Sequence, residues 1–248
     1  MNDVYYFATS KERPDFFGVS RPTAGAQVTF DEAKLYDYGP RDIWPSPYRR
    51  DGARGLVVYF DPLDVITWPC RLWKVHHLVQ PTKSMKVPFY LHCQSFEVLE
   101  EIPSWRVLGA YGTAVARLID EASDLTQAQV DIIASLDQSE ETRTEQAVLQ
   151  AWRAQLPSPT NHRPPFTPYG TAWDFLATAV ESSAARTGSH LFEWIEGAYR
   201  WPLLADSAWE QARRAALAAA LAVSVPDLLT DDDTNRLTRR WRTRSGSR

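Results

Sequence analysis

The chain has 248 residues, of which 44% are hydrophobic, 23% charged and 12% aromatic. These values exclude a disordered, collagen-like or coiled-coil protein, and the length suits one large domain or two small ones. The formal net charge of −4 is unevenly spread: residues 1–104 hold 12 basic and 13 acidic residues, residues 105–235 hold 9 and 18, and residues 236–248 hold six Arg and no acid. The pattern indicates an acidic body with a basic C-terminal segment.

Cysteine content and hydropathy indicate the cellular compartment in which the chain is expected. Cys70 and Cys93 are too few for a disulfide scaffold, so a reducing environment is expected. The first residues lack the pattern of a signal peptide, and no run of roughly 18 apolar residues is present. We therefore expect a cytoplasmic protein with no membrane partner and no cofactor.

The N-terminal part is typical of short strands separated by turns. Residues 1–104 hold 17 of the 30 aromatic residues and 10 of the 17 prolines. Runs rich in Val, Tyr, Phe and Trp predict strands at Val4–Phe7, Gln27–Phe30, Gly55–Phe60, Arg71–Val79, Val87–Cys93 and Phe96–Leu99. Asp61 and Pro62 predict a short helix between two of them, because Asp is a good N-cap and Pro suits the first helical position.

Two of these strands predict a hairpin. The runs 71–79 and 87–93 are joined by a short segment that contains Pro81, which favours an antiparallel pair with a turn centred near Lys83 and Ser84. This register places Val75–His77 opposite Tyr90–His92.

From about Val107 the hydrophobic period becomes helical. A Ser or Thr followed three residues later by an acidic residue or Gln fits a capping box. Such pairs predict helix starts at Thr126, Thr142, Ser207 and Thr230. The apolar period predicts two more helices, over Thr171–Arg186 and His190–Tyr199.

The predicted fold class is α+β, with a small, mostly antiparallel β-rich unit followed by an all-helical C-terminal unit. The β-rich unit is expected over residues 1–104, with residues 105–156 as a helical continuation packing on it. Five prolines in residues 157–170 predict an extended strap or linker. Residues 171–248 then form an Ala-rich helical unit with a basic tail.

Potential metal ligands are densest in and around the predicted hairpin, at Cys70, His76, His77, His92 and Cys93. The hairpin would let one His from each strand meet on one face. However, no paired-Cys, HxxxH or HExxH spacing is present, and adjacent residues such as His76 and His77 point to opposite faces of a regular strand. We therefore expect no metal site, and interpret these residues as buried or half-buried parts of strands.

An enzyme acting on a nucleotide or another anionic small molecule is the main alternative function. Its pocket would lie in the N-terminal unit, and the residues to test are Tyr59, Arg71, His76, His77 and His92. The chain has no G-x-G-x-x-G, P-loop, G-x-S-x-G or H-E-x-x-H motif. The common nucleotide-binding and hydrolase classes are therefore not indicated.

Two further chemistries use residues of the same region. A Cys–His pair is conceivable because the cation Arg71 follows Cys70 and would lower the pKa of a neighbouring thiol. The carboxylates Asp61, Asp64, Glu97, Glu100 and Glu101 are candidates for acid–base chemistry, although the first two suit a helix start and the last two are expected to face solvent.

The loop 38–54 predicts an exposed binding surface. It carries basic residues interleaved with aromatic ones, a combination that suits phosphate groups and stacked bases. These candidate anion- or partner-binding residues are Arg41, Trp44, Tyr48, Arg49, Arg50 and Arg54.

The basic tail is a candidate for nucleic-acid binding. Its candidate residues are Arg236, Arg239, Arg240, Arg242 and Arg244. The same cations also suit the C-terminus of a helix that begins at Asp231, and they are able to contact the acidic helical body of the chain itself.

The run from Gly55 to Ile66, followed by Arg71–Val75 and later by Trp105–Gly109, resembles a pattern in uncharacterised bacterial and phage proteins. The similarity covers residues 55–120 at most. It implies a small sheet and an origin in bacteria or mobile elements, and it implies no activity. Those proteins commonly carry His and Cys where this chain has Val57, Val58 and Tyr59.

No convergent set of catalytic residues is evident in the sequence, and the helical part is strongly charge-segregated. The leading hypothesis is therefore a non-catalytic interaction or regulatory module with a protein partner. Nucleic-acid binding through the tail is the second alternative after the enzyme.

Overall fold

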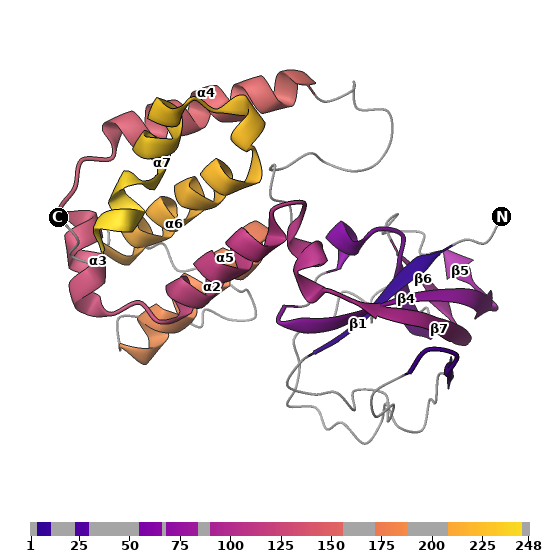
Figure 1. The fold of residues 1–248 in the computed structure, drawn as a ribbon. Coiled ribbons are helices and arrows are strands. Elements are labelled where there is room, and N and C mark those ends of the chain that lie inside the picture. The colour runs from indigo at the N-terminus through magenta and orange to yellow at the C-terminus, as the bar shows by residue number, and fades with distance from the viewer. Residues whose placement is uncertain are drawn as a thin grey trace, which may run out of the picture. The chain divides into compact units, whose positions relative to one another are not determined.

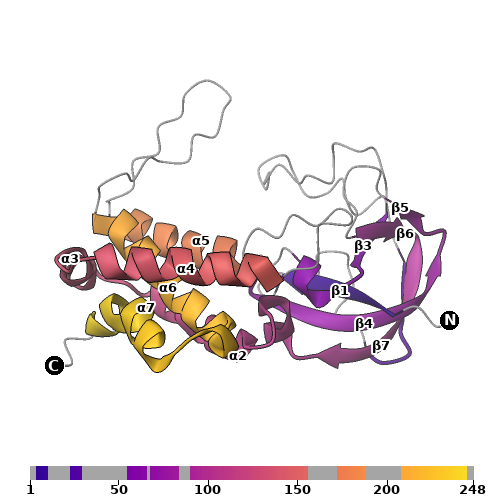
Figure 2. The ribbon, with the colours of Figure 1, turned by 90° about the horizontal axis from the view of Figure 1, so that it is seen from above.

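The computed structural model describes residues 4–10, 23–29, 55–65, 68–83, 90–155, 172–187 and 208–244. The chain divides into two compact units, residues 1–107 and 108–248. The described strands all lie in the first unit and the described α-helices in the second (Figures 1 and 2). The fold is therefore mixed α and β, with the β part preceding the helical part as predicted.

The β-rich unit is a seven-stranded antiparallel sheet with the order β2-β7-β4-β1-β3-β6-β5. Its strands lie close to the predicted runs. They are β1 (Tyr5–Ser10), β2 (Gln27–Thr29), β3 (Leu56–Tyr59), β4 (Cys70–Val79), β5 (Thr82–Lys83), β6 (Tyr90–Cys93) and β7 (Ser95–Ile102). The predicted short helix is the 3-10 turn η2 (Pro62–Asp64). Asp61 caps its start, because its carboxylate accepts a hydrogen bond from the Leu63 amide at 2.8 Å.

Residues 70–83 and 90–102 form one long, bent antiparallel ribbon. β4 pairs with β7 at one end, and β5 pairs with β6 at the other. Gln94 alone separates β6 from β7, and its amide donates to the Val79 carbonyl at 2.8 Å. In the sheet, β1 and β3 lie between β4 and β6, so the sheet curls back on itself.

The predicted hairpin register is wrong. Val75 pairs with Val98 and His76 with Glu97, six residues beyond the expected partners His92 and Leu91. The ladder itself explains the difference, because Thr82 pairs with His92 and Lys83 with Leu91. The first half of the ribbon therefore extends through Lys83, where the turn was expected, and the chain reverses later than the sequence predicts.

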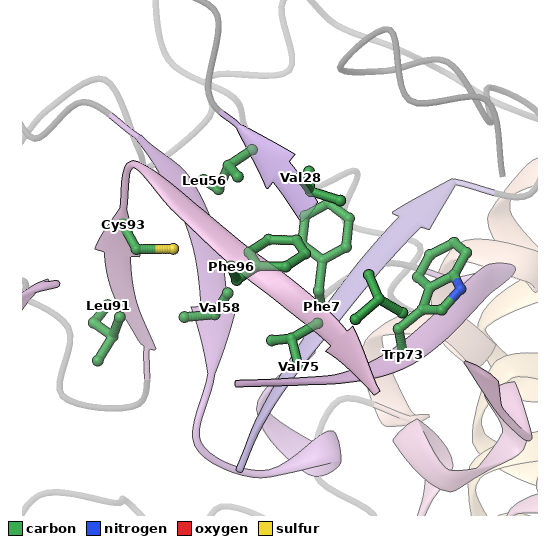
Figure 3. Close-up of a cluster of buried hydrophobic side chains, with 10 residues drawn as sticks. Phe7, Val28, Leu56, Val58, Trp73, Val75, Leu91, Cys93 and Phe96 are labelled. Carbon is green, nitrogen blue, oxygen red and sulfur yellow. The ribbon is translucent and has the colours of Figure 1, made fainter. Parts of the chain in front are cut away.

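Among the described residues, the main hydrophobic cluster of the β-rich unit is formed by strand side chains. Figure 3 shows Phe7 and Phe96 at its centre, with ring centroids 4.8 Å apart, and Trp73 on one side with its centroid 6.0 Å from that of Phe7. Residues of β1, β2, β3, β4, β6 and β7 contribute to the cluster. Burying each large apolar side chain contributes about 1.5–3 kcal/mol. Because these side chains must point into the core, the alternate residues of each strand point to the opposite, outer face of the sheet.

The helical unit contains α2 (Gly112–Ser123), α3 (Gln127–Ala134), α4 (Ser139–Gln155), α5 (Ala172–Arg186), α6 (Ala208–Ser224) and α7 (Asp231–Thr243). The 3-10 turns η3 (Ser104–Leu108) and η4 (Pro226–Leu228) precede α2 and α7. Capping boxes are present at Thr126 with Gln129 and at Thr230 with Asp233, which confirms both predicted starts.

The predicted start of α4 at Thr142 is wrong. The helix begins at Ser139, where the Asp137 carboxylate accepts from the Ser139 amide at 3.0 Å and from its hydroxyl at 2.6 Å. Glu140 and Glu141 then lie in the first turn, where the helix dipole favours negative charge.

Helix α6 is the centre of the helical unit. It packs against α2, α3, α5 and α7, and these surround it in Figures 1 and 2. Its alanines at 212, 215, 216, 218, 219, 220 and 222 are all buried. Residues 215–222 of α6 are therefore apolar and buried on every side, a pattern expected where other helices enclose the segment.

Several predicted segments lie outside the described residues. They are the proline-rich strap (157–170), the helix over His190–Tyr199 and Ser207, the predicted cap of α6. No helix in the described part of the chain is both long and apolar enough to cross a membrane.

Candidate metal site

Two β-bulges shape the ribbon between β4 and β7. Lys74 pairs with Glu100 but Val75 with Val98, so Leu99 is an extra residue in β7. His76 pairs with Glu97 but Val79 with Ser95, so β4 carries an extra residue just after His76. His77 lies there with a φ of 49°, a left-handed conformation in which a bulge re-aims a side chain.

The second bulge brings both adjacent histidines to one carboxylate. His76 Nε2 lies 3.5 Å from Glu97 Oε1, and His77 Nδ1 lies 3.1 Å from Glu97 Oε2. The two imidazole rings stack, with centroids 3.8 Å apart. The expectation that His76 and His77 point to opposite faces holds for a regular strand and is wrong at this bulge.

The three side chains form the one group of potential metal ligands found among the described residues. One donor atom from each lies within 4.8 Å of the others. A metal with bonds of 2.0–2.2 Å holds its ligand atoms about 3.3 Å apart, so small side-chain rotations would complete the geometry. His77 is well exposed and can make them.

The charge and hydrogen bonding of these three side chains favour a cation. The hydrogen bond with His77, supported by the nearby His76, holds the pKa of Glu97 below its ordinary value of 4.5, so this carboxylate is anionic at neutral pH. His76 Nε2 is buried, and its 3.5 Å contact with Glu97 is too long or poorly aligned for a good hydrogen bond. A buried ring nitrogen with so weak a partner is costly, and a bound metal ion would satisfy it.

Two ion pairs extend from the site along the same strands. Lys74 Nζ lies 2.5 Å from Glu100 Oε1, and the Arg71 guanidinium makes a two-bond contact with Glu101 at 2.8 and 2.5 Å. The guanidinium of Arg71 also lies over the Trp73 ring, 5.1 Å from its centroid. These pairs tie β4 to β7 beside the bulges.

Tyr59 and His92 lie away from this site. They belong to β3 and β6, which β1 separates from β4 in the sheet. Both are buried next to Tyr90, whose ring centroid lies 6.2 Å from that of Tyr59 and 5.4 Å from that of His92. The five residues proposed for an enzyme pocket thus lie in three different places: Tyr59 and His92 beside Tyr90, His76 and His77 beside Glu97, and Arg71 paired with Glu101.

The two cysteines are poor nucleophiles. Both are free and buried, and burial raises the pKa of Cys70 and of Cys93 to about 12. The guanidinium of Arg71 is engaged by Glu101. These thiols remain protonated at neutral pH, so the expected activation of Cys70 by its neighbour is absent.

The basic tail belongs to the helical unit. Arg240 is fully buried and bonded to Glu141 at 2.9 Å, and Arg244 contacts Glu121 and stacks on Trp241. Arg236 pairs with Asp232 at 2.6 Å, Arg239 donates to the Asp137 carbonyl at 2.9 Å and Arg242 donates to Asn235 at 3.3 Å. The tail thus contacts its own acidic body, as one interpretation of the sequence expected.

The other predicted anion-binding surface lies outside the described residues. It comprises Arg41, Trp44, Tyr48, Arg49, Arg50 and Arg54. The position of Gly55, immediately after it, is tightly fixed, since a Cβ there would lie 2.7 Å from the Cys93 carbonyl oxygen.

Sequence reasoning considered Glu97 for acid–base chemistry but did not group it with His76 and His77 as a potential metal ligand. The usable signal was an adjacent His pair followed by an acidic residue in the next strand of the same ribbon. That signal needs the correct register and the bulge, and neither follows from strand propensity alone.

Comparison with protein-family models, with curated proteins and with solved structures found no match. The site therefore has to be interpreted from its own chemistry.

Proposed function

We propose that the protein is a non-catalytic interaction or regulatory module whose β-rich unit binds a divalent transition-metal ion through His76, His77 and Glu97. One observation carries this proposal: donor atoms of three side chains from two strands lie within 4.8 Å of one another. A β-bulge in a left-handed conformation costs free energy, and a metal-ligand role for His77 would account for it.

The donor set favours particular ions. Two imidazoles and one carboxylate suit Zn²⁺ and its first-row neighbours, whereas Ca²⁺ and Mg²⁺ prefer sites made of oxygen atoms. Three protein ligands leave at least one coordination position open. The side chain of His77 is 65% exposed, so a partner can approach the site and supply a further ligand.

The non-catalytic part of the proposal is supported by the other candidate residues. The thiols are protonated, and Tyr59, Arg71 and His92 are engaged elsewhere in the sheet. We also propose a cytoplasmic setting, which the two free, buried cysteines support.

Isothermal titration of the full chain with Zn²⁺ tests the proposal. We expect one ion per chain, and an affinity lowered by about tenfold or more in both Glu97→Gln and His77→Ala, since each removes a ligand. Glu100→Gln is the matched control, because it removes the same charge from the same strand but no ligand. It should change the affinity by less than about threefold.

Circular dichroism of each variant establishes that it is folded. Absence of zinc binding by the wild type, or equal affinities of Glu97→Gln and the wild type, would overturn the proposed site.

A further inference from the structure

Lys74 lies next to the proposed metal site on the same face of the ribbon. Val75 points into the hydrophobic core, so its neighbours Lys74 and His76 both lie on the opposite face. Their Cα atoms are separated by two residues of extended strand, about 6.6 Å. The Lys74 side chain is 30% exposed, so its ammonium can reach a ligand from solvent as well as Glu100.

The charge of this face would become more positive when a metal ion binds. Lys74 pairs with Glu100, and Glu97 lies beside the two histidines, so Lys74, Glu97 and Glu100 together sum to −1. Arg106 also acts on Glu100, and including it brings the sum to zero. A divalent ion adds two positive charges, so by either count the loaded site is positive.

A positive site with an open coordination position binds anions. A carboxylate or phosphate offers two oxygen atoms, of which one can bind the metal ion and another can accept from an ammonium. The ammonium of Lys74 has three donors, so it can keep its contact with Glu100 and donate to the anion as well.

We propose that the metal-loaded site binds a small oxyanion, a carboxylate or a phosphate, with one oxygen on the metal and another on Lys74. The inference rests on the proposed metal site and names its ligand class. It makes anion binding conditional on the metal, and by linkage the anion tightens metal binding by the same factor.

The test uses the full chain loaded with Co²⁺, whose visible absorption responds to a change of ligand. Acetate and inorganic phosphate are titrated separately at constant ionic strength, with chloride as the reference anion. We expect a saturable spectral change with at least one of the two, and the tighter one identifies the ligand class. Lys74→Met should load Co²⁺ normally, but the anion concentration that gives half of the spectral change should rise by about fivefold or more.

Arg71→Gln is the matched control, since it removes one positive charge from the same strand in a side chain that lies over Trp73. It should leave the anion titration within about twofold of the wild type. Equal losses in Lys74→Met and Arg71→Gln, or normal Co²⁺ loading without any response to acetate or phosphate, would overturn the inference alone. Failure of Co²⁺ to load would overturn the metal site and the inference together.

Discussion

Arg240 is the most constrained charged residue that the structure describes. It is 0% exposed and donates to Glu141 on α4, to the Ile133 carbonyl on α3 at 3.3 Å, and to the backbone and side chain of Gln211 on α6 at 3.2 and 3.1 Å. A planar guanidinium with five donors suits this role, and an ammonium does not. A residue that the sequence placed among nucleic-acid contacts is instead a buried junction of four helices.

Replacing Arg240 should destabilise the helical unit strongly. Arg240→Met leaves the buried Glu141 carboxylate without its partner, and breaking such a pair costs about 3–5 kcal/mol. Burial raises the pKa of Glu141 even though Arg240 lowers it, so removing Arg240 leaves the cost of burying this carboxylate with less to offset it. Urea unfolding followed by far-UV circular dichroism measures the loss.

Arg239→Met is the matched control, because its guanidinium lies at the surface and bonds a single carbonyl. It should cost less than about 1 kcal/mol. Adding Glu141→Met to Arg240→Met should recover part of the stability, since no buried charge then remains unpaired. Equal stabilities of Arg239→Met and Arg240→Met would contradict this account.

At the level of elements, helix starts distinguish what sequence patterns predict well from what they do not. Thr126 and Thr230 accept from amides three residues later, as their capping boxes predict. Thr142 fits the same pattern but lies inside α4, because Asp137 satisfies the amide of Ser139 first.

This difference has a measurable consequence. Thr230→Ala removes an N-cap and should cost about 1 kcal/mol at neutral pH. Thr142→Ala should be neutral or slightly stabilising, because Ala has the higher helix propensity at an exposed interior position. Chemical unfolding of both variants checks the prediction, and a comparable loss in Thr142→Ala would contradict the observed start of α4.

The effect of Thr230→Ala should also depend on pH. Bonds from the Thr230 hydroxyl and amide hold the pKa of Asp233 below its ordinary value of 3.8. A lowered carboxyl pKa gives stability that is present above that ordinary value and is lost as the pH falls through the folded value. The difference between wild type and Thr230→Ala should therefore shrink in strong acid.

Strand positions were predictable because apolar, β-branched and aromatic runs fix which residues enter a sheet. Their pairing was not, since register depends on where the chain reverses, and Lys83, which was expected in the turn, instead pairs with Leu91. The bulges at Leu99 and His77 are less predictable still, because nothing in the alternation of β4 or β7 requires an extra residue. Neither the hydrophobic period nor strand propensity therefore predicts that His76, His77 and Glu97 come together.

At the level of the whole molecule, the residues of the proposed metal site all lie in the first of the two compact units. Zinc should therefore stabilise the first unit selectively. At a free concentration about 100-fold above the dissociation constant, the gain is about 2.7 kcal/mol. Hydrogen exchange with mass spectrometry should show slower exchange in peptides covering β4 and β7, with α2 and α3 unchanged.

Glu97→Gln controls for non-specific effects of zinc in that experiment. It should abolish the protection at β4 and β7. Protection that persists in this variant, or that appears equally in α2 and α3, would argue against a local site.

The enclosure of α6 has a consequence for how the helical unit assembles. Residues 215–222 of α6 are all buried, so this part of the helix gains little by forming alone, and α6 and its neighbours are expected to become ordered in one cooperative step. Helix α7 closes one flank of α6. A chain shortened before Asp231 would therefore expose an alanine- and leucine-rich surface and self-associate. The arginine-rich helix α7 thus keeps the folded unit from aggregating by covering this surface.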